Sequence, residues 1–423
     1  MLTRSAARGL HRAWRMLPPV QRRLLLARGA ALLAPRPASP PPAAYGVLVA
    51  GEIDRASGLG EGARLMAEAL RTLGVPVGTI RAGLRAPGKR NDRAPAAEHT
   101  AAASPEAMRE PGPDAALVMH VNAPQLPAAL LALRNIHPGR RRLVGYWAWE
   151  LPTLPRDWHP AAALVHEAWV PSRFTAEALR PLMPGRVRVV PHPLACVPPV
   201  RSALDRQAFG LPADAVVVLC SFSLASSFER KNPLAAIGAF RHAFGDRPDR
   251  IMLLKVSHVD HHPADLRRLR EAIGGAPNVR LETRILPRPD AHALTAAADI
   301  VLSLHRSEGF GLVPAEAMLL GKPVVATDWS ATTEFLDSGC GWPIGYRLVP
   351  AVDPRGVFQA PGAVWADASV PDAAIALRVL AEDAGRRKAL GDAARARASE
   401  RFGADALADA LRGIGLPPLP AGA

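Results

Sequence analysis

The chain has few cysteines: only Cys196, Cys220 and Cys340 occur among its 423 residues. They form no Cys-x-x-Cys pair and no other spacing typical of metal ligands, and the chain contains no Asp-x-Asp motif. These absences argue against a disulfide framework and against a bound metal, and they favour free thiols in a reducing compartment. No apolar run approaches roughly 18 residues, so the sequence predicts no membrane-spanning helix.

Acidic residues are missing from the N-terminus, where the first 36 residues hold eight arginines and no Asp or Glu. More than half of the formal net charge of +14 lies there. Because Arg28 interrupts the apolar residues of this segment, we expect no secretory signal. Three roles fit such a basic segment: contact with anionic lipid, nucleic-acid binding, or a solvated extension. Only the positive charge supports nucleic-acid binding, and we do not expect nucleic acid as a partner. We expect a cytoplasmic protein, with contact at the inner face of the membrane as one hypothesis.

The chain is 49% hydrophobic, which is ample for sizeable cores, and its length suits two domains. We expect a basic tail and a proline-rich linker at residues 1–44, and a first domain at residues 45–196. A second domain is expected at residues 197–400, followed by a C-terminal tail at residues 401–423.

The most informative stretch is a βαβ unit in the second domain. Residues 299–304 form a short apolar run with β-branched side chains, which predicts a buried strand. A turn with two glycines follows at residues 307–311, and Pro314 fits the first turn of a helix. The next buried strand is expected at residues 323–327. The unit therefore places a glycine loop at the carboxyl end of its first strand, where ligands of open α/β sheets bind.

This loop has the chemistry of a phosphate site. Gly309 and Gly311 let the backbone approach a ligand because they lack a Cβ atom. The backbone amides of Gly311, Leu312 and Val313 lie at the helix start, which carries partial positive charge. Glu308 precedes the loop, and Glu316 lies in the first turns of the helix. The helix dipole stabilises an acidic residue at this position, which would explain Glu316 without a ligand. The side chain of Glu316 also tilts toward the helix start, where a ligand would lie.

Glu308 and Glu316, eight residues apart around Gly-Phe-Gly, resemble the Glu-x7-Glu motif of retaining GT-B glycosyltransferases, the family 4-like group (group 1). Glu-Ala-Met and Gly-Lys-Pro-Val-Val, which follow, add to the match. The resemblance covers roughly residues 46–402. It implies an α/β fold of the GT-B type, in which two Rossmann-like domains face a cleft.

The resemblance also implies roles for these residues. Glu308 would act as a catalytic residue that contacts the donor sugar, and Glu316 would bind the ribose hydroxyls of the nucleotide. Four residues of the intervening loop and helix start would line the donor: Gly309, Phe310, Gly311 and Leu312.

Two cations, Arg230 and Lys231, stand just before a helix with Pro233 in its first turn. They are poorly placed for the helix dipole but well placed for a diphosphate. The resembling family often has a Gly-Arg-Leu segment and a Lys in this region. Lys231 matches the Lys, whereas residues 221–224 read Ser-Phe-Ser-Leu. Arg230 is a candidate for the missing Arg, and the sequence leaves this assignment open.

Three further features lie in the first domain. Gly58 and Gly60 follow the first strand, and the resemblance places this loop at the cleft, with a tight βα turn as the alternative. His120 ends a predicted strand, and the resemblance suggests a catalytic position beside the donor sugar, against a structural histidine. Glu150 ends the segment Tyr-Trp-Ala-Trp-Glu and is a candidate for acceptor contact, with a packed loop as the alternative.

The resemblance implies a retaining hexosyltransferase. It would move a hexose from a nucleotide diphosphate sugar to a hydroxyl of a glycan or lipid-linked acceptor, as in polysaccharide biosynthesis. We expect no metal and no cofactor beyond the nucleotide sugar as co-substrate. One alternative is a nucleotide-sugar-binding scaffold with a degenerate site, which the missing Gly-Arg-Leu segment favours. Another is an epimerase or phosphorylase on the same fold. The donor sugar, the base, the acceptor and the linkage are not predicted.

Overall fold

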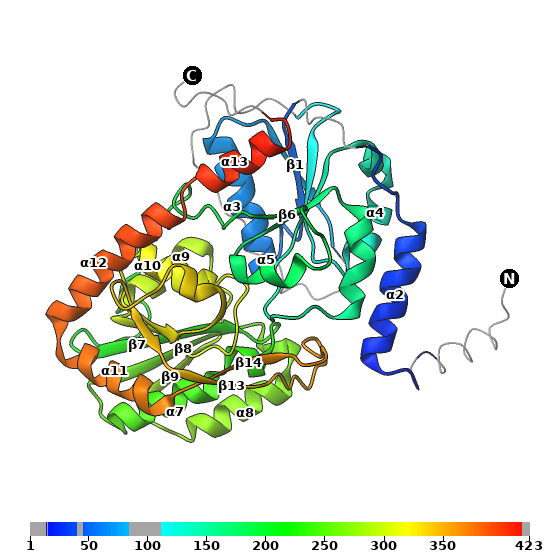
Figure 1. The fold of residues 1–423 in the computed structure, drawn as a ribbon. Coiled ribbons are helices and arrows are strands. Elements are labelled where there is room, and N and C mark those ends of the chain that lie inside the picture. Colours follow the sequence, from blue (N-terminus) through cyan, green and yellow to red (C-terminus); the bar gives the residue numbers. More distant parts are fainter. Residues whose placement is uncertain (1–13, 15, 40–44, 84–110, 417–423) are drawn as a thin grey trace.

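A computed structural model describes residues 14, 16–39, 45–83 and 111–416, which form two α/β domains, one above the other in Figure 1. Each domain contains one six-stranded sheet in which every pairing is parallel. The strand orders are β2-β1-β3-β4-β5-β6 and β12-β11-β10-β7-β8-β9. The two-domain α/β architecture expected from the sequence is therefore confirmed.

The central strands of the first sheet are buried, as is usual in parallel sheets, whose two faces are covered by helices. All five residues of its β3 are buried. Its strands are β1 (Val47–Gly51), β2 (Val77–Arg81), β3 (Ala116–His120), β4 (Leu143–Tyr146), β5 (Glu167–Val170) and β6 (Val187–Val189). Its helices and 3-10 turns are α3 (Gly58–Thr72), α4 (Leu126–Ala132), η3 (Arg134–Ile136), η4 (Pro138–Arg140), η5 (Arg156–Leu164) and α5 (Arg173–Leu179).

The second sheet is organised in the same way around β10, whose neighbours are β7 and β11. Its strands are β7 (Val216–Ser223), β8 (Arg250–Ser257), β9 (Val279–Glu282), β10 (Ile300–Ser303), β11 (Val324–Thr327) and β12 (Trp342–Ile344). Its helices and turns are α6 (Phe228–Lys231), α7 (Pro233–Phe244), η6 (Val259–His261), α8 (Pro263–Ile273), α9 (Arg288–Ala297), α10 (Leu312–Leu319), η7 (Ser330–Glu334), α11 (Val370–Glu382) and α12 (Ala384–Arg401).

A hairpin that the sequence analysis did not predict joins the two domains. It consists of β13 (Tyr346–Pro350), β14 (Val364–Ala368) and the connecting residues 351–363, called here the hairpin loop. Phe358 and Trp365 belong to the hydrophobic core of the first domain, where they pack with Trp149. The hairpin thus belongs to the second domain by sequence and fills part of the first domain's core.

The C-terminal residues also return to the first domain. Helix α12 leads along one side of the molecule to α13 (Asp405–Gly413), which lies on the first domain (Figure 1). Leu407 and Leu411 of α13 are buried in one cluster with Val47 and Met66. The segment from residue 401, expected from the sequence as a tail, therefore contains a helix that completes the core of the first domain through residue 416.

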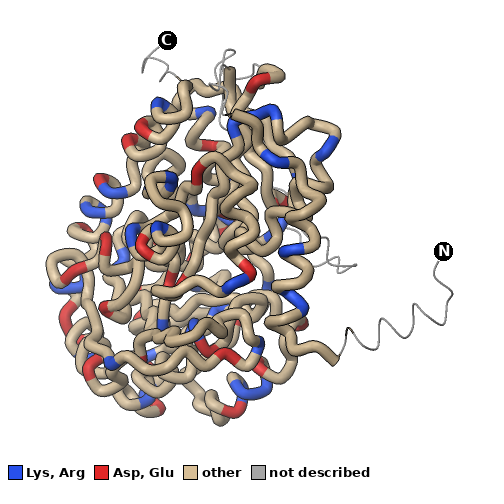
Figure 2. The backbone as a smooth tube through the Cα atoms, turned by 45° about the vertical axis from the view of Figure 1, so that its right-hand side comes forward, with Lys and Arg blue, Asp and Glu red and all other residues tan. Residues whose placement is uncertain are grey.

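Helix α2 (Pro19–Leu33) lies beside α4, at the edge of the first domain (Figure 1). Ala27 is buried, and Arg23 pairs with Asp157 at 3.1 Å. Figure 2 shows basic positions along this helix, which contains no Asp or Glu. The basic segment expected at residues 1–44 thus includes a helix that docks on the first domain. Among the described residues, no helix combines the length and apolar character that crossing a bilayer requires.

Candidate active site

The glycine loop at the carboxyl end of β10 lies directly against the first domain. The Gly309 carbonyl accepts a hydrogen bond from Ser172 Oγ at 2.7 Å and a second from Thr175 Oγ1 at 3.3 Å. A Cβ atom at Gly309 would lie only 2.9 Å from the Trp149 carbonyl oxygen. Only glycine allows this approach, so the loop lies at the junction between the two sheets.

Gly311 begins α10 in a left-handed conformation, with a φ angle of 99°. Left-handed backbone favours glycine, and here a Cβ atom would also lie 2.8 Å from Thr332 Cγ2. No side chain caps this helix start. Its first amides, at Leu312 and Val313, are therefore available to a ligand, and the helix dipole favours an anion there.

Glu308 is held firmly at the start of this loop. Its amide donates to Ser330 Oγ at 2.8 Å, and Ser330 adopts a φ angle of 68°, which is rare for a residue with a side chain. The Glu308 carboxylate accepts hydrogen bonds from Lys231 Nζ at 2.5 Å and from Arg230 Nη1 at 2.9 Å. Burial alone would raise its pKa, but the two cations hold the pKa well below its usual range. Glu308 is therefore an anion at neutral pH.

Lys231 is the more accessible of the two cations: its side chain is 20% exposed, against 4% for Arg230. Burial lowers the pKa of Lys231, and Glu308 partly offsets that shift. Two carboxylates, Glu308 and Glu150, lie beside the two cations, so the cluster carries no net charge when both are ionised. Lys231 is the cation that a further anion can reach, because it is the less buried of the two.

Glu316 lies on α10 and is half-buried. Burial and the nearby Glu61 raise its pKa to about 8, whereas Arg288 and Arg64 act in the opposite direction. A carboxyl group with this pKa is largely protonated at pH 7 without a ligand. Glu61 comes from the first domain, so the two domains bring this pair of carboxyls together.

Gly58 and Gly60, expected in a loop, instead belong to the first turn of α3, on the first-domain side of the same junction. A Cβ atom at Gly58 would lie 3.9 Å from Leu312, in ordinary contact with the start of α10. At Gly60 a Cβ atom would lie 2.5 Å from the Arg55 carbonyl, so this glycine lets the start of α3 pack closely on the residues before it. The predicted position beside the second domain therefore holds for Gly58, but the predicted loop is a helix start.

His120 lies at the end of β3 and is fully buried. It stacks on Tyr146, with ring centroids 4.3 Å apart, and neither ring nitrogen has a hydrogen-bond partner among the described residues. Burial, together with His192, holds its pKa well below the usual value, so the ring is neutral. The ring is inaccessible to solvent in this structure, and its catalytic role stays a prediction.

The aromatic residues before Glu150 are packed rather than exposed. Trp147 and Trp149 are 0% and 3% exposed, and both contact Trp158. They therefore present no stacking surface to a sugar. Glu150 itself is half-buried and lies 3.5 Å from Arg230 Nη2, while burial raises its pKa. Of the predicted acceptor features, only this carboxylate borders the cluster around Glu308.

Sequence reasoning missed the ion pairs that connect the domains. Arg288, at the start of α9, pairs with Glu61 at 3.1 Å and with Glu68 at 3.0 Å, and both glutamates are on α3 of the first domain. The only local signal for these ion pairs was Glu61, the acidic residue that follows Gly60. Partners 220 or more residues apart leave no pattern in a single sequence.

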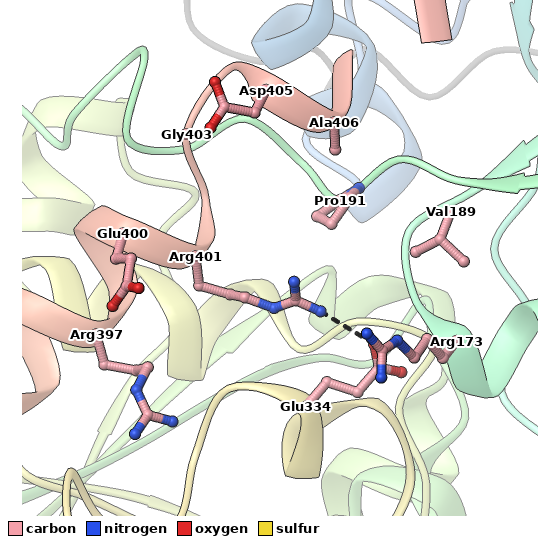
Figure 3. A pocket seen from close by; sticks show the side chains of 10 residues that line it. All are labelled: Arg173, Val189, Pro191, Glu334, Arg397, Glu400, Arg401, Gly403, Asp405 and Ala406. Atoms are coloured by element: carbon pink, nitrogen blue, oxygen red, sulfur yellow. Dashed lines mark ion pairs between the residues drawn. The ribbon is translucent and has the colours of Figure 1, made fainter. Parts of the chain in front are cut away.

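A cavity of about 660 Å³ is lined by none of the site residues named above (Figure 3). It occupies the bend between α12 and α13, where Arg173 and Arg401 point toward Glu334. Arg401 lies 3.7 Å from Glu334, which also accepts a hydrogen bond from the Phe174 amide. Three basic and three acidic side chains line the cavity, so their charges balance and the lining favours neither an anion nor a cation.

No three His, Cys, Asp or Glu side chains come together as metal ligands in the described part of the chain. What the site offers is an anion between two cations, a helix start without a cap and a titratable carboxyl on the same helix. Such an arrangement can bind a phosphate-bearing ligand and stabilise charge on both sides of a bond that breaks.

Comparison with known proteins connects this geometry to a family. Residues 216–367 match the family model described as Glycosyl transferases group 1. A D-inositol 3-phosphate glycosyltransferase of Xylanimonas cellulosilytica is 32% identical over 239 residues, which are 53% of this chain and 50% of the relative. An enzyme of the same name from Kineococcus radiotolerans is 32% identical over 241 residues, or 54% and 51%. The chain thus spans about half the length of these curated relatives.

Solved structures share the fold over most of the chain. HepE of Anabaena, in complex with UDP and glucose, has a TM-score of 0.57 and 17% identity, covering 88% of this chain and 97% of its own. A glycosyltransferase of Rickettsia africae has a TM-score of 0.59 and 13% identity, covering 88% and 99%. Sucrose-phosphate synthase of Thermosynechococcus elongatus also has a TM-score of 0.59, with 17% identity and coverage of 88% and 98%. At these identities the likeness shows the fold alone.

Proposed function

Since residues 216–367 match the group 1 glycosyltransferase model and the chain shares the fold of solved glycosyltransferases, we propose that it belongs to that family and transfers a hexose from a nucleotide diphosphate sugar to a hydroxyl of a glycan or lipid-linked acceptor. We further propose that the anomeric configuration is retained. The observation that carries the proposal is the contact of Glu308 with Lys231 and Arg230. This cluster borders the uncapped start of α10, where the two domains meet.

The diphosphate would bind between Lys231 and the first amides of α10. Negative charge grows on this group as its bond to the sugar breaks, and fixed donors stabilise that charge without reorganising. When the diphosphate occupies Lys231, the Glu308 carboxylate becomes free to accept hydrogen bonds from the donor sugar. Its negative charge then faces the positive charge that develops at the anomeric carbon.

Glu316 would bind the ribose hydroxyls. A protonated carboxyl donates one hydrogen bond, whereas a carboxylate accepts two, so nucleotide binding favours the ionised form. The nucleotide would also separate Glu316 from Glu61, whose charge raises its pKa. The donor-bound state is therefore expected to have a Glu316 pKa below about 8. The acceptor would contact the first domain, in which Glu150 borders the cluster around Glu308.

We predict that one nucleoside diphosphate or its sugar raises the melting temperature of the protein by about 3 °C at roughly 100 times its Kd, by mass action. The screen compares UDP, GDP, ADP and their glucose forms, and UDP-glucose comes first because HepE was solved with UDP and glucose. Glu316→Gln should lose the shift, while Glu271→Gln, at an exposed position of α8, should keep it.

The outcomes separate the alternatives. A shift followed by transfer to an acceptor supports the proposed function. A shift without transfer in any donor and acceptor mixture identifies a nucleotide-sugar-binding scaffold. Release of free sugar, or a requirement for phosphate, identifies an epimerase or a phosphorylase. No shift from any nucleotide at millimolar concentration contradicts the proposal.

We also propose that α2 lies on an anionic membrane surface. Its buried face docks on the first domain through Ala27, while its outer face exposes four leucines. Leu25, Leu26, Leu32 and Leu33 are 49%, 61%, 79% and 68% exposed. Leucines beside arginines, without acids, are the composition of a helix that lies in the interface of anionic lipid.

We predict that the protein sediments with vesicles of phosphatidylcholine and phosphatidylglycerol, and far less with phosphatidylcholine alone. The double variant Leu26→Glu, Leu33→Glu should weaken this binding at least about tenfold, because it removes apolar contact and adds repulsion. Ile375→Glu is the matched control, since Ile375 is 49% exposed on α11 of the other domain. Equal binding by all three proteins, or no binding, would contradict the proposal.

A further inference from the structure

The guanidinium of Arg230 donates its hydrogen bonds to other groups of the protein. Nη1 donates to the Ser307 carbonyl at 2.7 Å and to Glu308 at 2.9 Å. Nη2 donates to Ser226 Oγ at 2.9 Å and lies 3.5 Å from Glu150. The remaining donor, Nε, is buried without a partner. The hydrogens of Nη1 and Nη2 thus face groups of the protein, and the one hydrogen without an acceptor, on Nε, is buried in a residue that is 4% exposed.

Backbone geometry keeps this arginine in place. The Arg230 amide donates to Ser227 Oγ, the N-cap of α6, and its carbonyl accepts from the Arg306 amide at 2.7 Å. The helix then ends at Asn232, whose side chain donates to the Leu304 carbonyl at 3.0 Å. Arg230 is thus tied to the end of β10, from which the Glu308 loop starts.

The hairpin loop forms the remaining wall around the guanidinium. The ring of Phe358 lies under it, with its centroid 5.6 Å from Arg230 Cζ. The same ring packs on Trp149 of the first domain, with centroids 5.3 Å apart. Asp353, which is 2% exposed, accepts from the Phe358 amide and from Ser227 Oγ, both at 3.4 Å. The hairpin loop therefore holds the arginine, α6 and the Trp149–Glu150 segment in one arrangement.

Other contacts anchor the hairpin loop from both domains. Arg355 donates to the Leu224 carbonyl at 3.0 Å and pairs with Asp265 at 2.5 Å. From the opposite side, Arg23 of α2 donates to the Gly356 carbonyl at 2.6 Å. Figure 1 shows the loop beside β14 reaching toward the lower end of α2. A loop fixed at so many points acts as a rigid support.

We infer that Arg230 is a positioning residue, held by Phe358, that fixes Glu308 on the donor side and Glu150 on the acceptor side of the site. This inference rests on the proposed function and changes one expected assignment: Arg230 does not bind the diphosphate. Lys231, whose side chain is 20% exposed against 4% for Arg230, is the side chain that does. Because Arg230 contacts carboxylates from both domains, it sets the distance between the donor sugar and the acceptor hydroxyl.

The test separates nucleotide affinity from turnover. Arg230→Lys and Phe358→Leu should each keep the Kd for the nucleoside diphosphate within about threefold, while kcat for transfer falls about 100-fold for Arg230→Lys and about tenfold for Phe358→Leu. Lys231→Met should instead weaken the nucleotide Kd at least about tenfold. A lysine at 230 retains the charge but loses the fork that reaches two carboxylates.

Arg241→Lys, at an exposed position of α7, is the control and should change neither Kd nor kcat. Isothermal titration with the nucleotide found in the thermal screen measures Kd, and initial rates with that donor measure kcat. If Arg230→Lys weakens nucleotide affinity as much as Lys231→Met does, Arg230 is a diphosphate ligand and the inference is wrong. If the wild-type protein binds no nucleotide, the proposed function itself fails, and this is known before any variant is made.

Discussion

Replacing Glu308 with glutamine is expected to lower kcat for sugar transfer by about 10²–10³-fold while the protein stays folded. The amide keeps the shape of the side chain but not the charge that faces the anomeric carbon. The substitution also removes the carboxylate that pairs with Lys231. The ammonium of Lys231 can only donate hydrogen bonds, so it needs such an acceptor. Since Glu308 touches no part of the expected nucleotide, the Kd for the nucleoside diphosphate should stay equal or become tighter.

Alanine is the wrong probe at this position. It would leave two buried cations without their carboxylate, and breaking a buried pair in this way costs about 3–5 kcal/mol. A loss of activity in Glu308→Ala could then reflect unfolding rather than chemistry. Glu308→Gln avoids this ambiguity, and initial rates together with melting curves should be measured on the same samples. Transfer within about threefold of the wild-type rate, in a folded protein, would remove Glu308 from the reaction.

Gly311→Ala is expected to lower the free energy of unfolding by about 2–4 kcal/mol and to abolish most nucleotide binding. A side chain at a φ angle of 99° is strained, and the new Cβ would lie 2.8 Å from Thr332 Cγ2. Relief of this contact requires the loop or η7 to shift. Either movement displaces the amides of Leu312 and Val313, which form the expected diphosphate site.

Gly238 provides the matched control for this substitution. It lies inside α7 with a right-handed backbone, and a Cβ atom there would meet only Val370 at 3.7 Å, an ordinary contact. Gly238→Ala should therefore leave stability unchanged or raise it by about 0.5–1 kcal/mol, because alanine favours the helix. Urea denaturation of both variants gives the comparison. Equal stability of Gly311→Ala and Gly238→Ala would show that the loop tolerates a side chain.

The central βαβ unit was predictable because its signals are local. Buried parallel strands read as short continuous apolar runs, so the strands expected at residues 299–304 and 323–327 occur as β10 and β11. The glycines between these strands indicate a backbone that lies close to another group or adopts a left-handed conformation. The position of this loop at the carboxyl end of a strand then places a ligand site, without knowledge of the rest of the fold.

The surroundings of the glycine loop were not predictable in the same way. The hairpin at residues 346–368 contains Pro-Gly, a turn signal, but no local pattern shows that its Phe358 enters the core of the other domain. The segment at Trp147 and Trp149 reads equally well as a sugar-stacking surface and as a packed loop. Only burial by Trp158 and Phe358 decides for packing. Such contacts depend on how the two sheets face each other, which single-sequence patterns do not encode.

By itself, then, the sequence determined two α/β domains, the glycine loop and the candidate carboxylates and cations of the site. Each of these follows from residue type and short-range spacing, which restrict backbone conformation within one element. The tertiary structure alone decided the partners: Arg230 and Lys231 reach Glu308 across 78 and 77 residues of chain, and Arg230 also reaches Glu150 in the other domain. The guanidinium of Arg230 could equally have faced a diphosphate. Packing of the hairpin loop directs it to two carboxylates instead, because side-chain direction is set by the groups that surround it in the folded protein.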